Sequence, residues 1–321
     1  MKKTLTRLSY TLLVLCFLSF IASSCKTEGT KRKKAIKIEG KKTTPKPVSN
    51  AGLNVPAEQG GAGFDTLAVA QGWETNDNPS IYGAPNAKKG GEITLALQEY
   101  PATLRTEGRD SRSRVISIIG GLIYEPLLGL DPKTLKYTPA LATHWKISED
   151  KMTYWFRLDP RAKFSDGKPV TSRDVVATWK LLMDDGIEDP STQGTYSKYN
   201  EPIAESDYIV KVVCKEENWR NFLYIATSMS IFPNHYLEKI DGAGYLDKYQ
   251  YEMLPGTGPY IVDNDDTKKG ELLALKRRTD YWGKDDPTNV GTYNFDKIKM
   301  IFILDPRLEL EKIKSHNCKF N

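Results

Sequence analysis

The chain has 321 residues, 39% hydrophobic and 27% charged, a composition that fits a soluble globular protein of two or three domains, and its four cysteines are too few for a disulfide scaffold. Its net charge of +5 comes from residues 1–50, which hold 12 of the 46 basic residues and 2 of the 41 acidic ones, so the remainder carries −5. Because a nucleic-acid-binding protein carries its basic charge on the folded domain, we expect no nucleic acid partner.

Residues 1–24 are predicted to be a signal peptide, with a basic start and about 15 mostly apolar residues from 8 to 22, too few to span a bilayer. Small residues then lead to Cys25, as at a bacterial lipobox, although Ala22 stands where leucine is usual. We therefore expect an exported protein, lipidated on Cys25 and anchored to a membrane, facing the periplasm or the outer cell surface. Ordinary secretion is the alternative.

Residues 25–60 are rich in lysine, proline and glycine and almost free of aromatic residues. Such a segment cannot bury a core, so we expect a flexible basic tether. Folded sequence is expected to begin near Phe64.

Strands and helices alternate in the rest of the chain. Period-two and aromatic patterns predict strands at residues 92–97, 152–158, 208–216, 271–276 and 299–304. Residues 115–123 have helical spacing, with Asp110 or Ser111 as the expected N-cap. Thr171 and Asp174 form a variant capping box that opens a second helix, and a last helix is expected after residue 305. The fold class is therefore α/β or α+β.

The sequence shows no recognised catalytic or metal-binding motif. The sequence lacks the His-Glu-x-x-His, Gly-x-Ser-x-Gly, P-loop and Cys-x-x-Cys patterns, and its three histidines are far apart. We expect no enzyme activity, no metal and no cofactor. Gly256 and Gly258 begin a dinucleotide-like pattern whose third glycine is missing, so a tight backbone turn is the better interpretation. Cys214 is expected in a strand, and the state of Cys318 is left open.

Six motifs, taken together, resemble a known family. They are residues 123–128 (IYEPLL), 139–145 (PALATHW), 154–158 (YWFRL), 164–171 (FSDGKPVT), 256–260 (GTGPY) and 280–283 (DYWG). Their order and spacing are similar to those of the family 5 extracellular solute-binding proteins. These are the peptide- and oligopeptide-binding components of ABC importers, with some members that bind nickel, haem or sugars.

The resemblance implies a periplasmic-binding-protein-like fold of two lobes around a cleft, with a small domain inserted in the first lobe. Residues 61–129 and 219–305 would form lobe I, residues 130–218 the insert, and residues 306–321 the start of the crossover to lobe II. Family members are commonly much longer, so the expectation is a truncated chain that lacks the second lobe and binds peptides weakly.

The resemblance also implies a ligand-binding wall on lobe I. Its expected residues are Arg109, Ser111, Arg112, Ser228, Met229, Ser230, Tyr281 and Trp282. Arg109 and Arg112 can pair with a peptide carboxylate, since guanidinium and carboxylate match in a bidentate geometry. The alternative is that both are solvated residues at the start of a helix.

The expected function is thus a monomeric substrate-binding lipoprotein that captures peptides for the permease and ATPase subunits of an ABC importer. Two alternatives stay open: a surface lipoprotein that acts as an adhesin, sensor or chaperone on the same scaffold, and an inactive truncated remnant.

Overall fold

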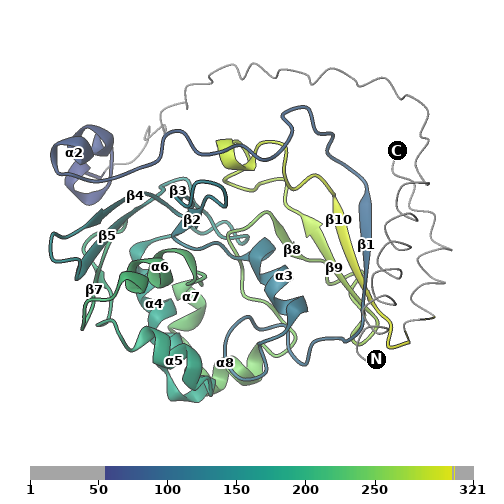
Figure 1. The fold of residues 1–321 in the computed structure, drawn as a ribbon. Helices are drawn as coiled ribbons and strands as arrows, with labels where there is room; N and C mark the ends of the chain where they lie inside the picture. The colour runs from purple at the N-terminus through teal and green to yellow at the C-terminus, as the bar shows by residue number, and fades with distance from the viewer. Residues whose placement is uncertain (1–54, 306, 308–321) are drawn as a thin grey trace, which may run out of the picture. The chain divides into compact units, whose positions relative to one another are not determined.

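The computed structural model describes residues 55–305 and residue 307 (Figure 1). The predicted signal peptide, Cys25, most of the tether, Cys318 and all of the expected crossover except residue 307 lie outside the described residues.

The first sheet joins the beginning of the described chain to its end. Its strand order is β1-β10-β9-β8, and β1 and β10 run parallel while the other neighbours are antiparallel. The strands are β1 (Glu92–Leu97), β8 (Tyr260–Val262), β9 (Leu272–Arg277) and β10 (Lys297–Phe302). The predicted strands at 92–97, 271–276 and 299–304 are confirmed within two residues.

The second sheet is built from the middle of the chain, in the antiparallel order β4-β5-β7-β6. Its strands, with those of the adjoining ribbon, are β2 (Leu128–Leu130), β3 (Tyr137–Pro139), β4 (Ala142–Ile147), β5 (Thr153–Leu158), β6 (Ile203–Ala204) and β7 (Ile209–Val213). Cys214 follows β7 as a buried free thiol in an isolated bridge to Tyr199, and its burial raises the pKa of the thiol.

The helices of the described residues are mostly short. They are η1 (Ala57–Gln59), α2 (Phe64–Ala70), α3 (Arg114–Ile123), α4 (Ser172–Met183), η2 (Asp185–Ile187), α5 (Pro190–Tyr196), α6 (Trp219–Thr227), α7 (Asn234–Leu237), α8 (Gly242–Lys248) and η3 (Pro287–Asn289). Asp174 and Thr171 form the predicted capping box of α4. None of the described helices is long and apolar enough to cross a membrane.

Each sheet has its own core. Helix α3 and the segment that includes α8 pack with β1, β8, β9 and β10, and Ile119, Leu275 and Met300 are fully buried there (Figure 1). Helices α4 and α6 pack against the second sheet, where the rings of Phe156 and Phe222 stack at 5.6 Å. Each such buried side chain stabilises the fold by about 1.5–3 kcal/mol.

The described chain begins on the second sheet rather than the first. Phe64 of α2 is 1% exposed, and the Arg157 guanidinium lies over its ring. Arg157 also donates from Nε to the carbonyl of Gly60 at 3.0 Å. Residues 55–60, placed at the end of the tether by sequence, therefore already pack on the folded chain, because their backbone satisfies a buried guanidinium. The boundaries between lobe and insert remain a prediction.

The N-cap of α3 differs from the expected one. Asp110 has a left-handed backbone with φ of 63°, which is not the extended geometry of a cap, and Ser111 lies two residues before the observed cap, its amide donating to the carbonyl of Gly108. Ser113 caps the helix instead, and its hydroxyl accepts from the amide of Ile116 at 3.1 Å.

Ser113→Ala should lower the free energy of unfolding by about 1 kcal/mol, since an N-cap side chain satisfies an otherwise unpaired amide. Urea denaturation measures the change. Ser197→Ala, at an exposed C-cap hydroxyl, is the control and should change it by less than about 0.5 kcal/mol. Equal losses in both variants would contradict the assignment of the cap.

Candidate functional site

The arginine segment predicted to bind ligand lies against the α5 region. Gly108 (φ 84°) lets the loop approach Ile187, whose carbonyl accepts from the amide of Arg109 at 2.8 Å. The Arg109 side chain pairs with Glu188 at 2.5 Å, and the Arg112 side chain pairs with Asp189 at 2.8 Å.

The two guanidinium groups are accessible from solvent. The side chains of Arg109 and Arg112 are 55% and 62% exposed, whereas that of Asp189 is 8% exposed. Ser111, between them in sequence, is buried. The segment therefore presents two cations at the surface, with Arg109 paired to Asp110 and Glu188 and Arg112 paired to Asp189.

Glu107 precedes these arginines and is partly buried. Burial, together with the charge of Asp189, raises the pKa of the Glu107 carboxyl to about 8, while Arg112 acts in the opposite direction. The carboxyl is thus poised to change its charge near neutral pH.

Tyr281 and Trp282 contact Glu125, although more than 150 residues separate them in the sequence. The Tyr281 hydroxyl donates to Oε1 of Glu125 at 2.5 Å, and Nε1 of Trp282 donates to Oε2 at 3.0 Å. Burial raises the pKa of the Glu125 carboxyl to about 7, against the effect of these hydrogen bonds. Tyr281 is 4% exposed; its hydroxyl is bonded to Glu125 and its ring packs edge-on against that of Trp282.

Residues 228–231, which follow α6, also lie beside Glu125. The amide of Ile231 donates to the carbonyl of Glu125 at 3.2 Å. Met229 is buried in the core that Trp282 also contacts, Ser230 is partly buried, and Ser228 is exposed. The structure therefore brings residues 228–230 and 281–282 together around Glu125. Residues 109–112 lie at the other end of α3, whose ten residues span about 15 Å.

Gly256 and Gly258 lie in a bend of the chain that approaches the end of α3 closely, and no hydrogen bond within residues 256–259 closes a turn. The amide of Gly258 donates to the carbonyl of Ile123 at 2.8 Å, and a Cβ on Gly256 would lie 2.0 Å from that carbonyl oxygen. The buried Arg278 guanidinium donates hydrogen bonds to the carbonyls of residues 256–258. These glycines pack the loop onto α3.

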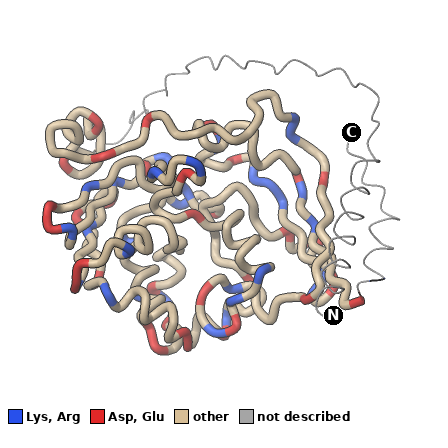
Figure 2. Tube along the Cα trace, viewed as in Figure 1, with Lys and Arg blue, Asp and Glu red and all other residues tan. Residues whose placement is uncertain are grey.

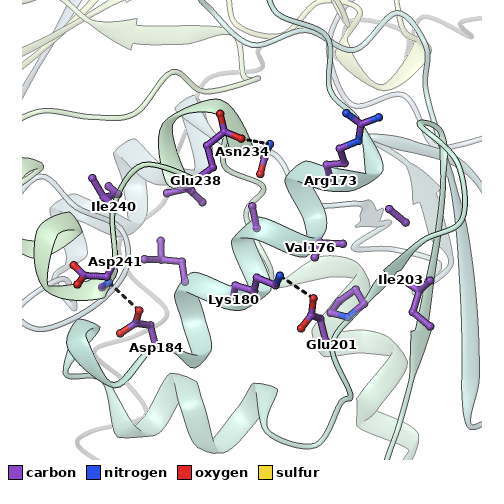
Figure 3. A pocket seen from close by; sticks show the side chains of 16 residues that line it. Arg173, Val176, Lys180, Asp184, Glu201, Ile203, Asn234, Glu238, Ile240 and Asp241 are labelled. Carbon is purple, nitrogen blue, oxygen red and sulfur yellow. Dashed lines mark hydrogen bonds and ion pairs between the residues drawn. The ribbon is translucent and has the colours of Figure 1, made fainter.

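A pocket of about 680 Å³ lies elsewhere and was not predicted (Figure 3). Its walls come from α4, from β6 with the residues before it, and from α7 with the loop that follows. The lining residues are Arg173, Val176, Ala177, Lys180, Leu181, Asp184, Glu201, Pro202, Ile203, Ala204, Asn234, Leu237, Glu238, Ile240, Asp241 and Gly242. None of the residues predicted to bind ligand is among them.

The described residues hold no candidate metal site. Basic and acidic residues are interspersed along the described chain (Figure 2). Within residues 55–305, no group of three or more His, Cys, Asp or Glu side chains could hold a metal ion.

Residues 136–320 match the family model of the bacterial extracellular solute-binding proteins, family 5 (middle region). The chain belongs to this family. It is a family of binding proteins, and the fold is accordingly periplasmic-binding-protein-like, as predicted.

Matches to curated relatives span about three-quarters of this chain but less than half of each relative. It is 29% identical over 248 residues to the peptidoglycan-binding protein YepA of Agrobacterium fabrum, a match that spans 73% of this chain and 38% of the relative. It is 28% identical to the uncharacterized protein YejA of Escherichia coli, with 75% and 38% covered. The chain thus spans about two-fifths of the length of these relatives.

Solved structures share the fold. The oligopeptide-binding protein AppA of Bacillus subtilis, in complex with a nonapeptide, matches with a TM-score of 0.62 and 21% identity, over 72% of this chain and 43% of that one. DppA of Helicobacter pylori, in complex with the peptide STSA, matches with a TM-score of 0.57 and 20% identity, over 71% and 46%.

Proposed function

We propose that this chain is the solute-binding component of an ABC importer, captures peptides outside the cytoplasmic membrane, and passes them to permease and ATPase subunits. The observation that carries the proposal is the family match over residues 136–320. Two proteins of the same fold, AppA and DppA, hold peptides in their solved structures, which supports a peptide as the ligand class.

Within this proposal, the exposed residues of the predicted wall touch the peptide and the buried ones position them. Arg112 is the strongest contact, because its guanidinium is solvent-accessible and already held in place by Asp189. A peptide carboxylate would add a charge-assisted hydrogen bond to that guanidinium. In this proposal Ser228 and the partly exposed Trp282 also contact the peptide. The buried residues Ser111, Met229 and Tyr281 do not contact it and instead pack beneath the exposed ones.

Isothermal titration of the 321-residue chain with a nonapeptide and with a pool of di- to hexapeptides tests the proposal. These 321 residues correspond to about two-fifths of the length of the relatives, and part of a site covers less of a peptide than the roughly 70–90% buried in a closed site, so we expect a Kd near millimolar, about −4 kcal/mol. Arg112→Glu should weaken binding at least tenfold. Arg220→Glu, which changes an exposed arginine over the Trp219 ring, should not. Equal binding by both variants would contradict the proposed surface.

A peptidoglycan fragment is the second candidate ligand, because the relative from Agrobacterium fabrum is named a peptidoglycan-binding protein. Muropeptides and the same peptides without sugar, titrated in parallel, separate the two candidates. Tighter binding of the muropeptide would favour the second candidate.

The lipid anchor on Cys25 belongs to the same proposal. Cys25→Ser should move the protein from the membrane fraction to the soluble fraction, since stable anchoring requires two or more acyl chains. Cell fractionation after a high-salt wash, followed by immunoblotting, measures the distribution, and Cys16→Ser is the matched control. A Cys25→Ser protein that stays in the washed membranes would disprove the anchor.

A further inference from the structure

The pocket between α4, β6 and α7 has the form of a groove with an apolar floor. Val176 and Ala177 of α4 and Leu237 of α7 contribute apolar surface to its lining. Figure 3 shows Val176 and Lys180 on α4, between Glu238 on one side and Glu201 and Ile203 on the other. We call it the α4–β6 groove. Its volume lies within the roughly 300–1,000 Å³ typical of ligand pockets.

One wall of the groove includes the two-residue strand β6, which stands at the edge of its sheet. β6 stands last in the order β4-β5-β7-β6 and pairs with β7 on one side. Among the described residues, no strand pairs with its other side. Ile203 of β6 is 50% exposed and lines the groove, so its apolar side chain is available to an occupant. A free edge offers unpaired backbone groups to an extended peptide, which can add itself as a further strand.

The charges around the groove favour a basic occupant. Its lining carries four carboxylates (Asp184, Glu201, Glu238 and Asp241) and two cations (Arg173 and Lys180). Both cations are already engaged: Lys180 pairs with Glu201 at 2.9 Å, and Arg173 pairs with Asp207 at 2.8 Å.

Three carboxylates therefore remain without a cationic partner among the described residues. Asp184 and Asp241 accept from backbone amides that cap nearby turns and helices. Glu238 has only a 3.4 Å hydrogen bond from the Asn234 side chain and is exposed. Glu238 is thus the acidic group most available to a bound cation.

We propose that the α4–β6 groove docks an extended, basic segment of a partner protein. The segment adds a strand to the free edge of β6, places alternate apolar side chains on the floor around Val176, and directs lysine or arginine toward Glu238. The apolar residues around Val176, the edge strand β6 and the carboxylate of Glu238 are the three features that favour an extended segment with both apolar and basic side chains. The site shares no residue with the surface proposed above for the transported ligand.

The test uses the full chain and a fluorescently labelled ten-residue peptide of alternating lysine and valine. Fluorescence anisotropy measures its affinity, and hydrogen exchange locates it. We expect slower amide exchange at residues 201–204 in the presence of the peptide. Glu238→Lys should weaken binding at least tenfold, and Val176→Arg, which fills the floor with a like charge, should weaken it as much.

Glu252→Lys is the matched control, because it makes the same charge change at an exposed residue outside the groove. It should leave the affinity within about twofold. Circular dichroism melting confirms that each variant is folded, and Glu238, as an exposed residue, can be changed without loss of the core. Either of two results would overturn the proposal: wild-type affinity in both groove variants, or equal affinity for a glutamate–valine peptide. Self-association of the chain that Glu238→Lys abolishes would also overturn it, since the occupant would then be a second copy.

Discussion

Gly256→Ala should lower the free energy of unfolding by about 3 kcal/mol, although it adds a single methyl group. The added Cβ would lie 2.0 Å from the carbonyl oxygen of Ile123 and 2.6 Å from its Cγ2. The carbonyl is backbone of α3 and cannot rotate away, so the loop itself must move. That movement would disturb the carbonyls bound by Arg278, and overpacking of this kind costs about 1–3 kcal/mol or more.

Gly194→Ala is the matched control for this prediction. Gly194 lies in α5, and a Cβ there would meet no atom within 4 Å. Because alanine is the better helix former, we expect a gain of about 0.5–1 kcal/mol. Urea denaturation of both variants under one set of conditions measures the two changes. If Gly256→Ala unfolds at the wild-type urea concentration, the close approach of loop and helix is wrong.

Local sequence patterns identified a minority of the described helices and strands, among them most of the longer ones. The alternation in residues 92–97 predicted β1, and Thr171 with Asp174 predicted the start of α4, because each signal depends on neighbouring residues alone. The N-cap of α3 was misplaced by two or three residues. Asp110, Ser111 and Ser113 all precede that helix, and only the structure shows that Ser113 has the extended backbone and accepts from the amide of Ile116.

Non-local arrangements escaped such patterns. The parallel pairing of Leu97 with Phe302 joins residues 205 positions apart, and no local signal specifies a partner strand. For the same reason the packing of Phe64 under Arg157 was not predicted, although the buried aromatic residue itself marked the start of the folded chain.

The candidate site likewise contains residues that the sequence identified and contacts that only the structure shows. The resemblance named Tyr281 and Trp282, but their hydrogen bonds to Glu125 appear only in the structure, because Glu125 lies more than 150 residues away in the sequence. The α4–β6 groove was missed entirely. Val176 and Lys180 are ordinary residues on the solvent side of a helix, and only the position of β6 and α7 beside them makes a pocket.

Glu107 should make the stability of the protein fall as the pH rises. Its pKa is raised, chiefly by burial, from an ordinary value of 4.5 to about 8 in the folded chain. Between these two pH values the folded chain therefore binds a proton that the unfolded chain has already released. Because the folded state binds more protons there, its free energy of unfolding decreases across this window.

Glu107→Gln removes this titration. The free energy of unfolding of the variant minus that of the wild type should therefore be more positive at pH 9 than at pH 4.5. The shift, discounted for the partial exposure of the residue, corresponds to a pH-dependent gain on the order of 2 kcal/mol. Urea denaturation at pH 4.5, 6, 7.5 and 9 measures the difference from wild type at each pH. Glu252→Gln, at an exposed carboxyl, is the control and should give a difference independent of pH. A Glu107→Gln difference that is equally constant from pH 4.5 to 9 would show that the carboxyl titrates normally in the folded chain. In that case Glu107 would be ionised beside Asp189 at neutral pH, and the loop that carries Arg109 and Arg112 would gain nothing from protonation.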